Sequence, residues 1–144
     1  MKAITFIAAI FMTTASLFAQ DVPESQVPSV VLNTFKKEFP KASDVEWERQ
    51  GEQYNVDFEI SFFTDYEAWF DTSGKLLRHS EDISESDLPN AIKDAIKKQY
   101  DGYHIDDVEK ITESKMETFL VEIEKGNDEI NLYFSKDGKI VKNK

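Results

Sequence analysis

Hydrophobic residues follow two different periods along this chain. In two segments they recur at i, i+4 and i+8, the spacing of one buried helix face. These two stripes are Val31, Phe35 and Phe39, and Ile92, Ile96 and Tyr100. Elsewhere they alternate with polar residues, which predicts strands that bury one face. The alternating stretches are 54–62, 65–71, 119–124 and 129–134, with shorter runs at 45–48, 75–78, 107–111 and 139–142.

These elements occur twice in the same order. We therefore predict an α+β fold built as a tandem repeat, in which each repeat has one helix and about four antiparallel strands. The repeats are expected at 27–83 and 88–144. Each helix should cover the apolar face of its sheet, because such a face is not stable in water. The matched pairs expected in the core are Phe58 with Ile123 and Phe70 with Phe134.

The segment 79–87, between the repeats, is polar and acidic, and we expect it to be a short linker. Its last residue, Asp87, is a candidate N-cap for the second helix, because an aspartate side chain can accept a hydrogen bond from a free N–H group there. Trp47 follows Val45 on its strand and is expected in the core.

The first 19 residues have the pattern of a secretory signal peptide. Met1 and Lys2 form a short basic start, an apolar stretch follows, and Ala19 is a small residue at a plausible cleavage point. The mature chain, 20–144, would be a single domain in the periplasm or secreted, with no membrane insertion after cleavage. The chain has no cysteine, which excludes disulfides and thiolate chemistry.

The composition is strongly acidic. The chain has 17 lysines and arginines against 28 aspartates and glutamates, and its formal net charge is −11 at pH 7. Such a chain repels nucleic acid and anionic lipid surfaces. Nucleic acid is therefore excluded as a partner, while basic partners and divalent cations are favoured.

No arrangement of residues predicts catalysis. His79 and His104 are the only histidines, and both lie in polar contexts typical of surface residues. No nucleophile-elbow motif occurs, and a catalytic triad needs a base beside a nucleophile. We therefore predict no catalytic residue and a protein that is not an enzyme.

Calcium is the one cofactor that the acidic residues make plausible, because hard cations bind carboxylate oxygens. No cluster has the spacing of an EF-hand loop, so no metal ligand is assigned. The candidate clusters are Asp82, Glu85 and Asp87; Asp101, Asp106 and Asp107; and Asp128 and Glu129.

The predicted strand 65–71 directs one set of side chains away from the helix. Because Phe70 belongs to the core face, strand alternation places Trp69 on the outer face among carboxylates. An exposed aromatic in such a place is typical of a binding surface, although a cross-strand pair that only stabilises the sheet is the alternative. The predicted binding residues are Trp69, Phe63, Tyr133 and Glu67.

Three motifs in the first repeat resemble a known family. The sequence Val-Glu-Trp-Glu at 45–48, Tyr-Asn-Val-Asp-Phe at 54–58 and Ala-Trp-Phe-Asp-Thr-Ser-Gly-Lys at 68–75 is similar to the PepSY-like, beta-lactamase-inhibitor-like periplasmic proteins. The second repeat matches less well, with Lys110 in the place of Trp47. The resemblance implies a beta-lactamase-inhibitor-protein-like fold whose sheet forms a curved, partly exposed surface.

In the beta-lactamase inhibitor protein, that surface binds an enzyme, but fold alone does not carry an activity over. The function expected here is a non-enzymatic periplasmic or secreted interaction module. It would act as a monomer and use its outer sheet face to bind a protein or peptide. The alternative is a calcium-responsive envelope protein that uses its acidic loops.

Overall fold

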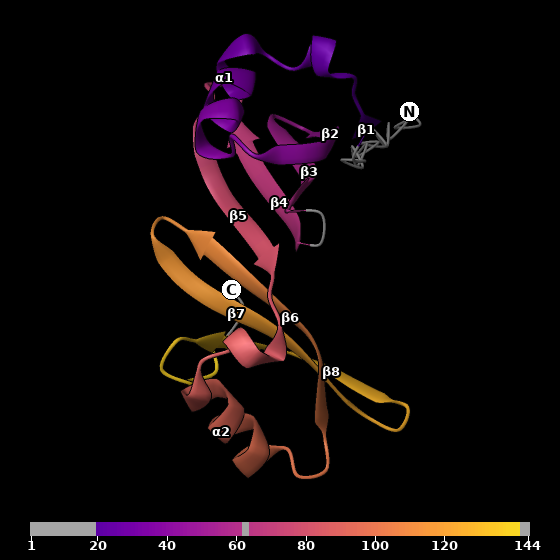
Figure 1. Ribbon diagram of the computed structural model, residues 1–144, viewed down its shortest axis with the longest axis vertical. Coiled ribbons are helices and arrows are strands. Elements are labelled where there is room, and N and C mark those ends of the chain that lie inside the picture. Colours follow the sequence, from indigo (N-terminus) through magenta and orange to yellow (C-terminus); the bar gives the residue numbers. More distant parts are fainter. Residues whose placement is uncertain (1–19, 62–63, 142–144) are drawn as a thin grey trace, which may run out of the picture.

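All strands of the computed structural model, which describes residues 20–61 and 64–141, belong to one antiparallel sheet (Figure 1). Strands that follow each other in sequence are neighbours in the sheet, in the order β1 to β8. The strands are β1 (Gln20–Asp21), β2 (Ala42–Gln50), β3 (Gln53–Ile60), β4 (Thr64–Asp71), β5 (Leu76–Asp82), β6 (His104–Glu113), β7 (Met116–Lys125) and β8 (Asp128–Ser135). The helices are α1 (Ser29–Glu38) and α2 (Asn90–Gln99), each preceded by a 3-10 turn, η1 (Glu24–Gln26) and η2 (Glu85–Asp87).

Both α-helices begin directly after a proline, Pro28 for α1 and Pro89 for α2. A proline at this position costs the helix no hydrogen bond, because the first N–H groups of a helix have no acceptor within it. The expectation that Asp87 caps α2 is wrong. Leu88 precedes a proline and is held in extended conformation, so Asp87 closes η2 and α2 starts three residues later, at Asn90.

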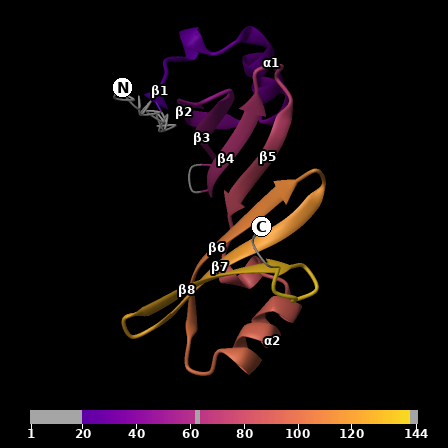
Figure 2. The ribbon, with the colours of Figure 1, turned by 180° about the vertical axis from the view of Figure 1, so that it is seen from behind.

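The two helices lie at opposite ends of the molecule but on the same face of the sheet (Figures 1 and 2). The strand register shows this, because directly opposed residues share a face. Phe58 packs under α1 and Phe119 packs in the core that contains α2. One row of opposed residues joins them across the sheet: Phe58, Tyr66, Glu81, Lys110, Phe119 and Phe134.

Each half of the chain, 20–82 and 83–141, has its own hydrophobic core. The expected burial of Phe58, Phe70, Ile123 and Phe134 is confirmed, because all four side chains are at most 3% exposed. Trp47 is also buried, as expected. The core residues of the first half are Val27, Val31, Phe35, Phe39, Trp47, Tyr54, Val56, Phe58, Ala68 and Phe70. Those of the second half are Leu88, Ile92, Ile96, Val108, Phe119, Val121, Ile123, Leu132 and Phe134.

A glycine holds a sheet turn against the first turn of each helix. Gly74 has φ +84°, and a Cβ there would lie 2.7 Å from the carbonyl oxygen of Val30 in α1. Gly138 has φ +80°, and its Cβ would lie 2.5 Å from the carbonyl oxygen of Ala91 in α2. Only glycine combines this backbone conformation with so close an approach.

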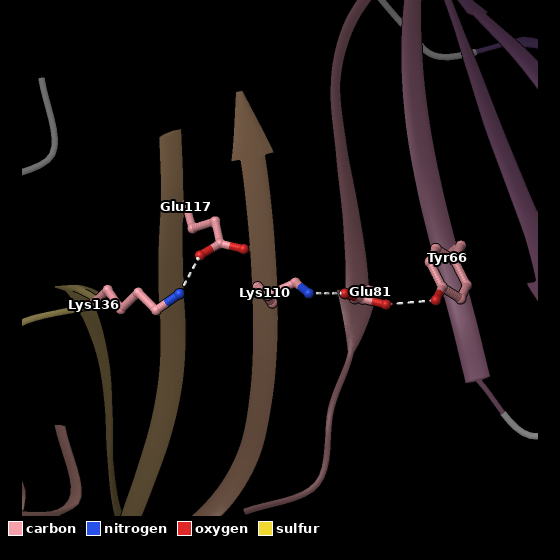
Figure 3. A network of polar contacts seen from close by, with 5 residues as sticks. All are labelled: Tyr66, Glu81, Lys110, Glu117 and Lys136. Carbon is pink, nitrogen blue, oxygen red and sulfur yellow. Dashed lines mark hydrogen bonds and ion pairs between the residues drawn. The ribbon is translucent and has the colours of Figure 1, made fainter. Parts of the chain in front are cut away.

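The expectation that 79–87 is a linker is wrong for its first four residues. They form the end of β5 and pair with β6, from His79 opposite Thr112 to Asp82 opposite Glu109. A polar strand is stable here because its side chains find partners. Glu81 accepts a hydrogen bond from the Tyr66 hydroxyl at 2.5 Å and forms an ion pair with Lys110 (Figure 3).

The two histidines differ in environment. His104 is exposed, as expected, but the expectation of a surface position is wrong for His79. The His79 ring is half-buried on the helix side of the sheet, with its centroid 5.7 Å from that of Phe39. Burial lowers the pKa of His79, so the ring is held toward its neutral form.

The second half has three regular strands rather than about four. The expected last strand, 139–142, is reduced in the described residues to a single bridge between Ile140 and Phe134. Residue 142 lies outside the part of the chain that the structure describes.

The first prediction concerns the contact between α1 and the sheet. Phe35 is 4% exposed, and its ring lies 5.0 Å from that of Phe58 and 5.2 Å from that of Trp47, centroid to centroid. Phe35→Ala should lower the free energy of unfolding by about 3–5 kcal/mol, because it leaves a cavity among these rings. Chemical denaturation followed by circular dichroism measures the change.

The matched control for this experiment is Asn33→Ala, an exposed position in the same helix. It should change the stability by no more than about 0.5 kcal/mol. Similar losses in both variants would contradict the role of Phe35 as the main anchor of α1.

Candidate functional site

The face of the sheet opposite α1 and α2, here called the outer face, is where the sequence predicts binding. Two adjacent rows of opposed residues cross it. The first row is Glu46, Asp57, Glu67, Ser80, Ile111, Thr118 and Ser135. The second row is Asp82, Glu109, Leu120 and Tyr133.

An open groove of about 450 Å³ lies where these rows begin, over β2 to β6. We call it the acidic groove, because carboxylates dominate its walls and, among the residues that the structure describes, no lysine, arginine or histidine lines it. Its eight acidic residues are Asp44, Glu46, Asp57, Glu59, Asp65, Glu67, Asp82 and Glu109, and Phe58, Tyr66 and Ser80 complete the lining.

The carboxylates of the groove are close enough to disturb each other. Asp82 is the clearest case: partial burial, followed by repulsion from Asp107, Asp65 and Glu109, raises its pKa to about 6. Partial burial also raises the pKa of Asp57, with further repulsion from neighbouring glutamates. The groove therefore holds negative charge at neutral pH against both desolvation and repulsion, and the attraction of a bound cation would offset these costs.

Asn55 lies beside the groove on the outer face, directly opposite Trp69. It is only 9% exposed, and its side-chain nitrogen donates a hydrogen bond to Glu67. Its Oδ1 atom is buried and has no hydrogen-bond partner among the described residues. A buried acceptor of this kind is costly unless a donor reaches it. The Oδ1 atom of Asn55 is thus a polar group beside the groove that no described residue satisfies.

Glu67 joins Asn55 to the groove and was among the predicted binding residues. Burial raises its pKa, and repulsion from Asp57 and Glu109 adds to this effect. The hydrogen bond from Asn55 and the charge of Arg78 act in the opposite direction.

Trp69 faces away from the helices, as predicted, but the expectation that its ring is exposed is wrong. It is 8% exposed, because Arg78 lies directly opposite it on β5 and places its guanidinium carbon 3.6 Å from the ring centroid. Stacking of arginine on an indole ring is favourable and removes the ring from water. The sequence could not reveal this cover, because it depends on which β5 residue faces Trp69.

The other two predicted binding residues lie elsewhere. Tyr133 is half-buried on the outer face in β8, opposite Leu120, and so belongs to the second half rather than to the groove. Phe63 lies outside the described residues. Of the four predicted residues, the structure brings Glu67 and Trp69 together through Asn55.

The acidic clusters predicted for calcium do not form three-ligand groups among the described residues. The groups whose ligand atoms lie within 4.8 Å of one another combine different strands instead. They are His104, Asp106 and Glu124, and Glu122, Glu124 and Glu129. Asp106 and Glu129 were in the predicted clusters, but the β7 glutamates were not, because they become neighbours only through strand pairing.

No helix in the described part of the chain is long and apolar enough to cross a membrane. Solved structures similar to this one come from Bacteroides species. A BLIP-like protein from Bacteroides fragilis is 26% identical and matches with a TM-score of 0.69 over 81% of this chain and 84% of its own. A DUF2874 family protein from Bacteroides uniformis is 24% identical, with a TM-score of 0.72 over 80% and 86% of the two chains.

A third structure, from Bacteroides eggerthii and described as a "putative periplasmic" protein, is 20% identical, with a TM-score of 0.72 over 81% of this chain and 86% of its own. The comparison with curated proteins found no match. The model of the family described as "Putative beta-lactamase-inhibitor-like, PepSY-like" matches residues 14–62 and 57–142. Because these segments span most of the sequence, this chain belongs to the PepSY-like, beta-lactamase-inhibitor-like family.

Proposed function

We propose that this protein is a non-enzymatic binding protein whose acidic groove holds a basic segment of a protein or peptide partner. The observation that carries the proposal is the groove itself, where eight carboxylates face one open volume and none of the described lysines, arginines or histidines belongs to its lining. Next to Glu67, the buried Oδ1 atom of Asn55 lacks a hydrogen-bond donor among the described residues. Lysine and arginine side chains supply positive charge and several N–H donors each.

A chain of cations fits this groove better than a single ion does. A metal ion needs several ligand atoms around one point, and the described residues meet that condition only outside the groove. The groove carboxylates instead stand on successive strands, about 4.8 Å apart. Lysines or arginines along a peptide could each meet a different carboxylate.

The family favours a protein as the partner, because its description refers to inhibitor-like proteins. The description of the Bacteroides eggerthii relative favours the periplasm as the place of action. We further infer that the protein acts as a monomer and that its two halves are copies of one helix-and-strands module. The matched glycines, Gly74 against α1 and Gly138 against α2, support this repeat.

A labelled hexa-arginine peptide tests the proposed function. Fluorescence anisotropy should detect binding that weakens as salt is added, because the attraction is electrostatic. Glu67→Gln should weaken it about tenfold, which corresponds to about 1.4 kcal/mol.

The matched control is Asp94→Asn, which removes the same charge from an exposed position on α2. It should leave the affinity nearly unchanged. Equal losses in both variants would mean that net charge alone attracts the peptide, and the groove would then not be the site.

Protonation of Asp82 generates a stability prediction. Its pKa is raised from 3.8 to about 6, so the folded protein holds this proton more tightly than the unfolded chain does. The contribution of Asp82 to stability therefore falls as the pH rises through this window and is lowest above it. Asp82→Asn should raise the melting midpoint at about pH 7.5, and the gain should shrink at about pH 4.5.

Differential scanning fluorimetry at both pH values measures this effect, with Asp94→Asn as the control. The same proton should also oppose peptide binding, so the wild-type affinity for hexa-arginine should rise as the pH increases through about 6. A gain in melting midpoint that does not depend on pH would contradict the raised pKa.

Calcium binding is a second candidate function, favoured by the group of Glu122, Glu124 and Glu129 on β7 and β8. Its test is a calcium titration of the melting midpoint. A site predicts a saturable rise that Glu124→Gln abolishes, because this residue belongs to both three-ligand groups. A flat titration, or a rise that is equal in Glu124→Gln, would rule it out.

A further inference from the structure

Along the two rows that cross the acidic groove, the side chains of the outer face change from acidic to uncharged. In the first row, acidic residues stand on β2, β3 and β4, and uncharged residues follow from Ser80 on β5 through Ile111 on β6. In the second row, Asp82 and Glu109 are followed by Leu120 and Tyr133. The carboxylates end on β4 in the first row and on β6 in the second, and apolar or uncharged side chains follow from there to β8.

We call the second region the apolar patch and define it as Ile111, Met116, Thr118, Leu120 and Tyr133. Met116 is 69% exposed, and the other four are half-buried. Both helices lie on the opposite face, so the cores they cover do not include these residues. Large apolar side chains on a sheet face that the chain leaves without a helix are typical of binding surfaces.

We propose that the partner segment has two parts: a cationic part that fills the acidic groove, and a large apolar side chain that rests on the apolar patch. This inference rests on the proposed function and extends it. Charge complementarity supports the cationic part, since the described residues of the groove lining include eight carboxylates and no basic group. The position of the apolar patch supports the apolar part, since the same rows of opposed residues that line the groove continue into the patch.

The sheet also sets the spacing within the partner. Glu67 stands on β4 and Leu120 on β7, three strand intervals away. Neighbouring strands are about 4.8 Å apart, so the separation across the face is about 14 Å. An extended peptide advances about 3.3 Å per residue, and about four residues would therefore connect its basic part to its apolar side chain.

Trp69 does not belong to the apolar patch, because Arg78 covers its ring. Their stacked pair lies in the neighbouring row, between Asn55 and Glu113, and keeps the indole ring covered. The apolar contact is therefore assigned to Leu120 and Tyr133 rather than to Trp69. The sheet offers them directly beside Glu109, the last carboxylate of the groove.

Three synthetic peptides test the inference by fluorescence anisotropy. The first carries three arginines, a spacer of four glycine and serine residues, and a leucine–tyrosine pair. The second replaces the leucine–tyrosine pair by serines, and the third has the composition of the first without separation between the two parts. The first peptide should bind about tenfold more tightly than either of the others.

The variants locate the apolar contact. Leu120→Ser should remove the tenfold advantage of the first peptide and leave the affinity of the second unchanged. Met116→Ser repeats the test at a position exposed enough not to affect folding, and it should reduce the same advantage in part. Val30→Ser, an exposed apolar position on α1, is the matched control and should change neither affinity.

The outcomes separate the two proposals. If the first two peptides bind equally well and both lose affinity in Glu67→Gln, the acidic groove stands and the two-part partner is overturned. If the first peptide keeps its tenfold tighter binding in both Leu120→Ser and Met116→Ser, the apolar patch is not the source of that difference, and this part of the inference is overturned. If no peptide binds, or if Glu67→Gln has no effect on any of them, the proposed function fails together with the inference.

Discussion

The pairing of β5 with β6 is the interaction on which the rest of this structure depends. It is the one strand pairing between the two halves in the described part of the chain, and it runs from Arg78 opposite Glu113 to Asp82 opposite Glu109. Its side chains are almost all polar, so burial of apolar surface contributes little to it. Backbone hydrogen bonds, the ion pair of Glu81 with Lys110 and the Tyr66 hydroxyl hold it instead (Figure 3). The acidic groove and the apolar patch share one face because this pairing exists.

The two faces of the sheet have different roles in stability. The helix face carries the apolar side chains of both cores, including four aromatic rings around Phe35 in the first half. Folding therefore places few demands on the outer face. That face can hold a concentration of carboxylates that costs stability at neutral pH, as the raised pKa of Asp82 indicates. Residues that disfavour the folded state and face an open groove are more readily explained by binding than by folding.

Polar groups on the two faces of the sheet also differ in their pKa shifts and in their hydrogen-bond partners. On the helix side, hydrogen bonds and the ion pair outweigh the effect of burial and lower the pKa of Glu81, so its charge is matched. On the outer face, the pKa values of Asp57, Glu67 and Asp82 are all raised, and the Oδ1 atom of Asn55 has no partner among the described residues. The junction between the halves is thus electrostatically satisfied, whereas the groove next to it is not. This contrast is the main physical reason to place the function on the outer face.

The sequence by itself determined the features that depend on local periodicity. Helical spacing identified Val31 and Phe35 as buried, and alternation placed Phe58 and Phe70 in the core and Trp69 on the outer face. Tertiary structure alone decided which residues lie opposite each other across strands, because alternation determines the face of each side chain but not its partner on the next strand. Three contacts depend on that choice of partners: Arg78 stacks on Trp69, Asn55 donates a hydrogen bond to Glu67, and residues 79–82 pair with β6. The acidic groove and the apolar patch are products of that register, since each combines residues from several paired strands.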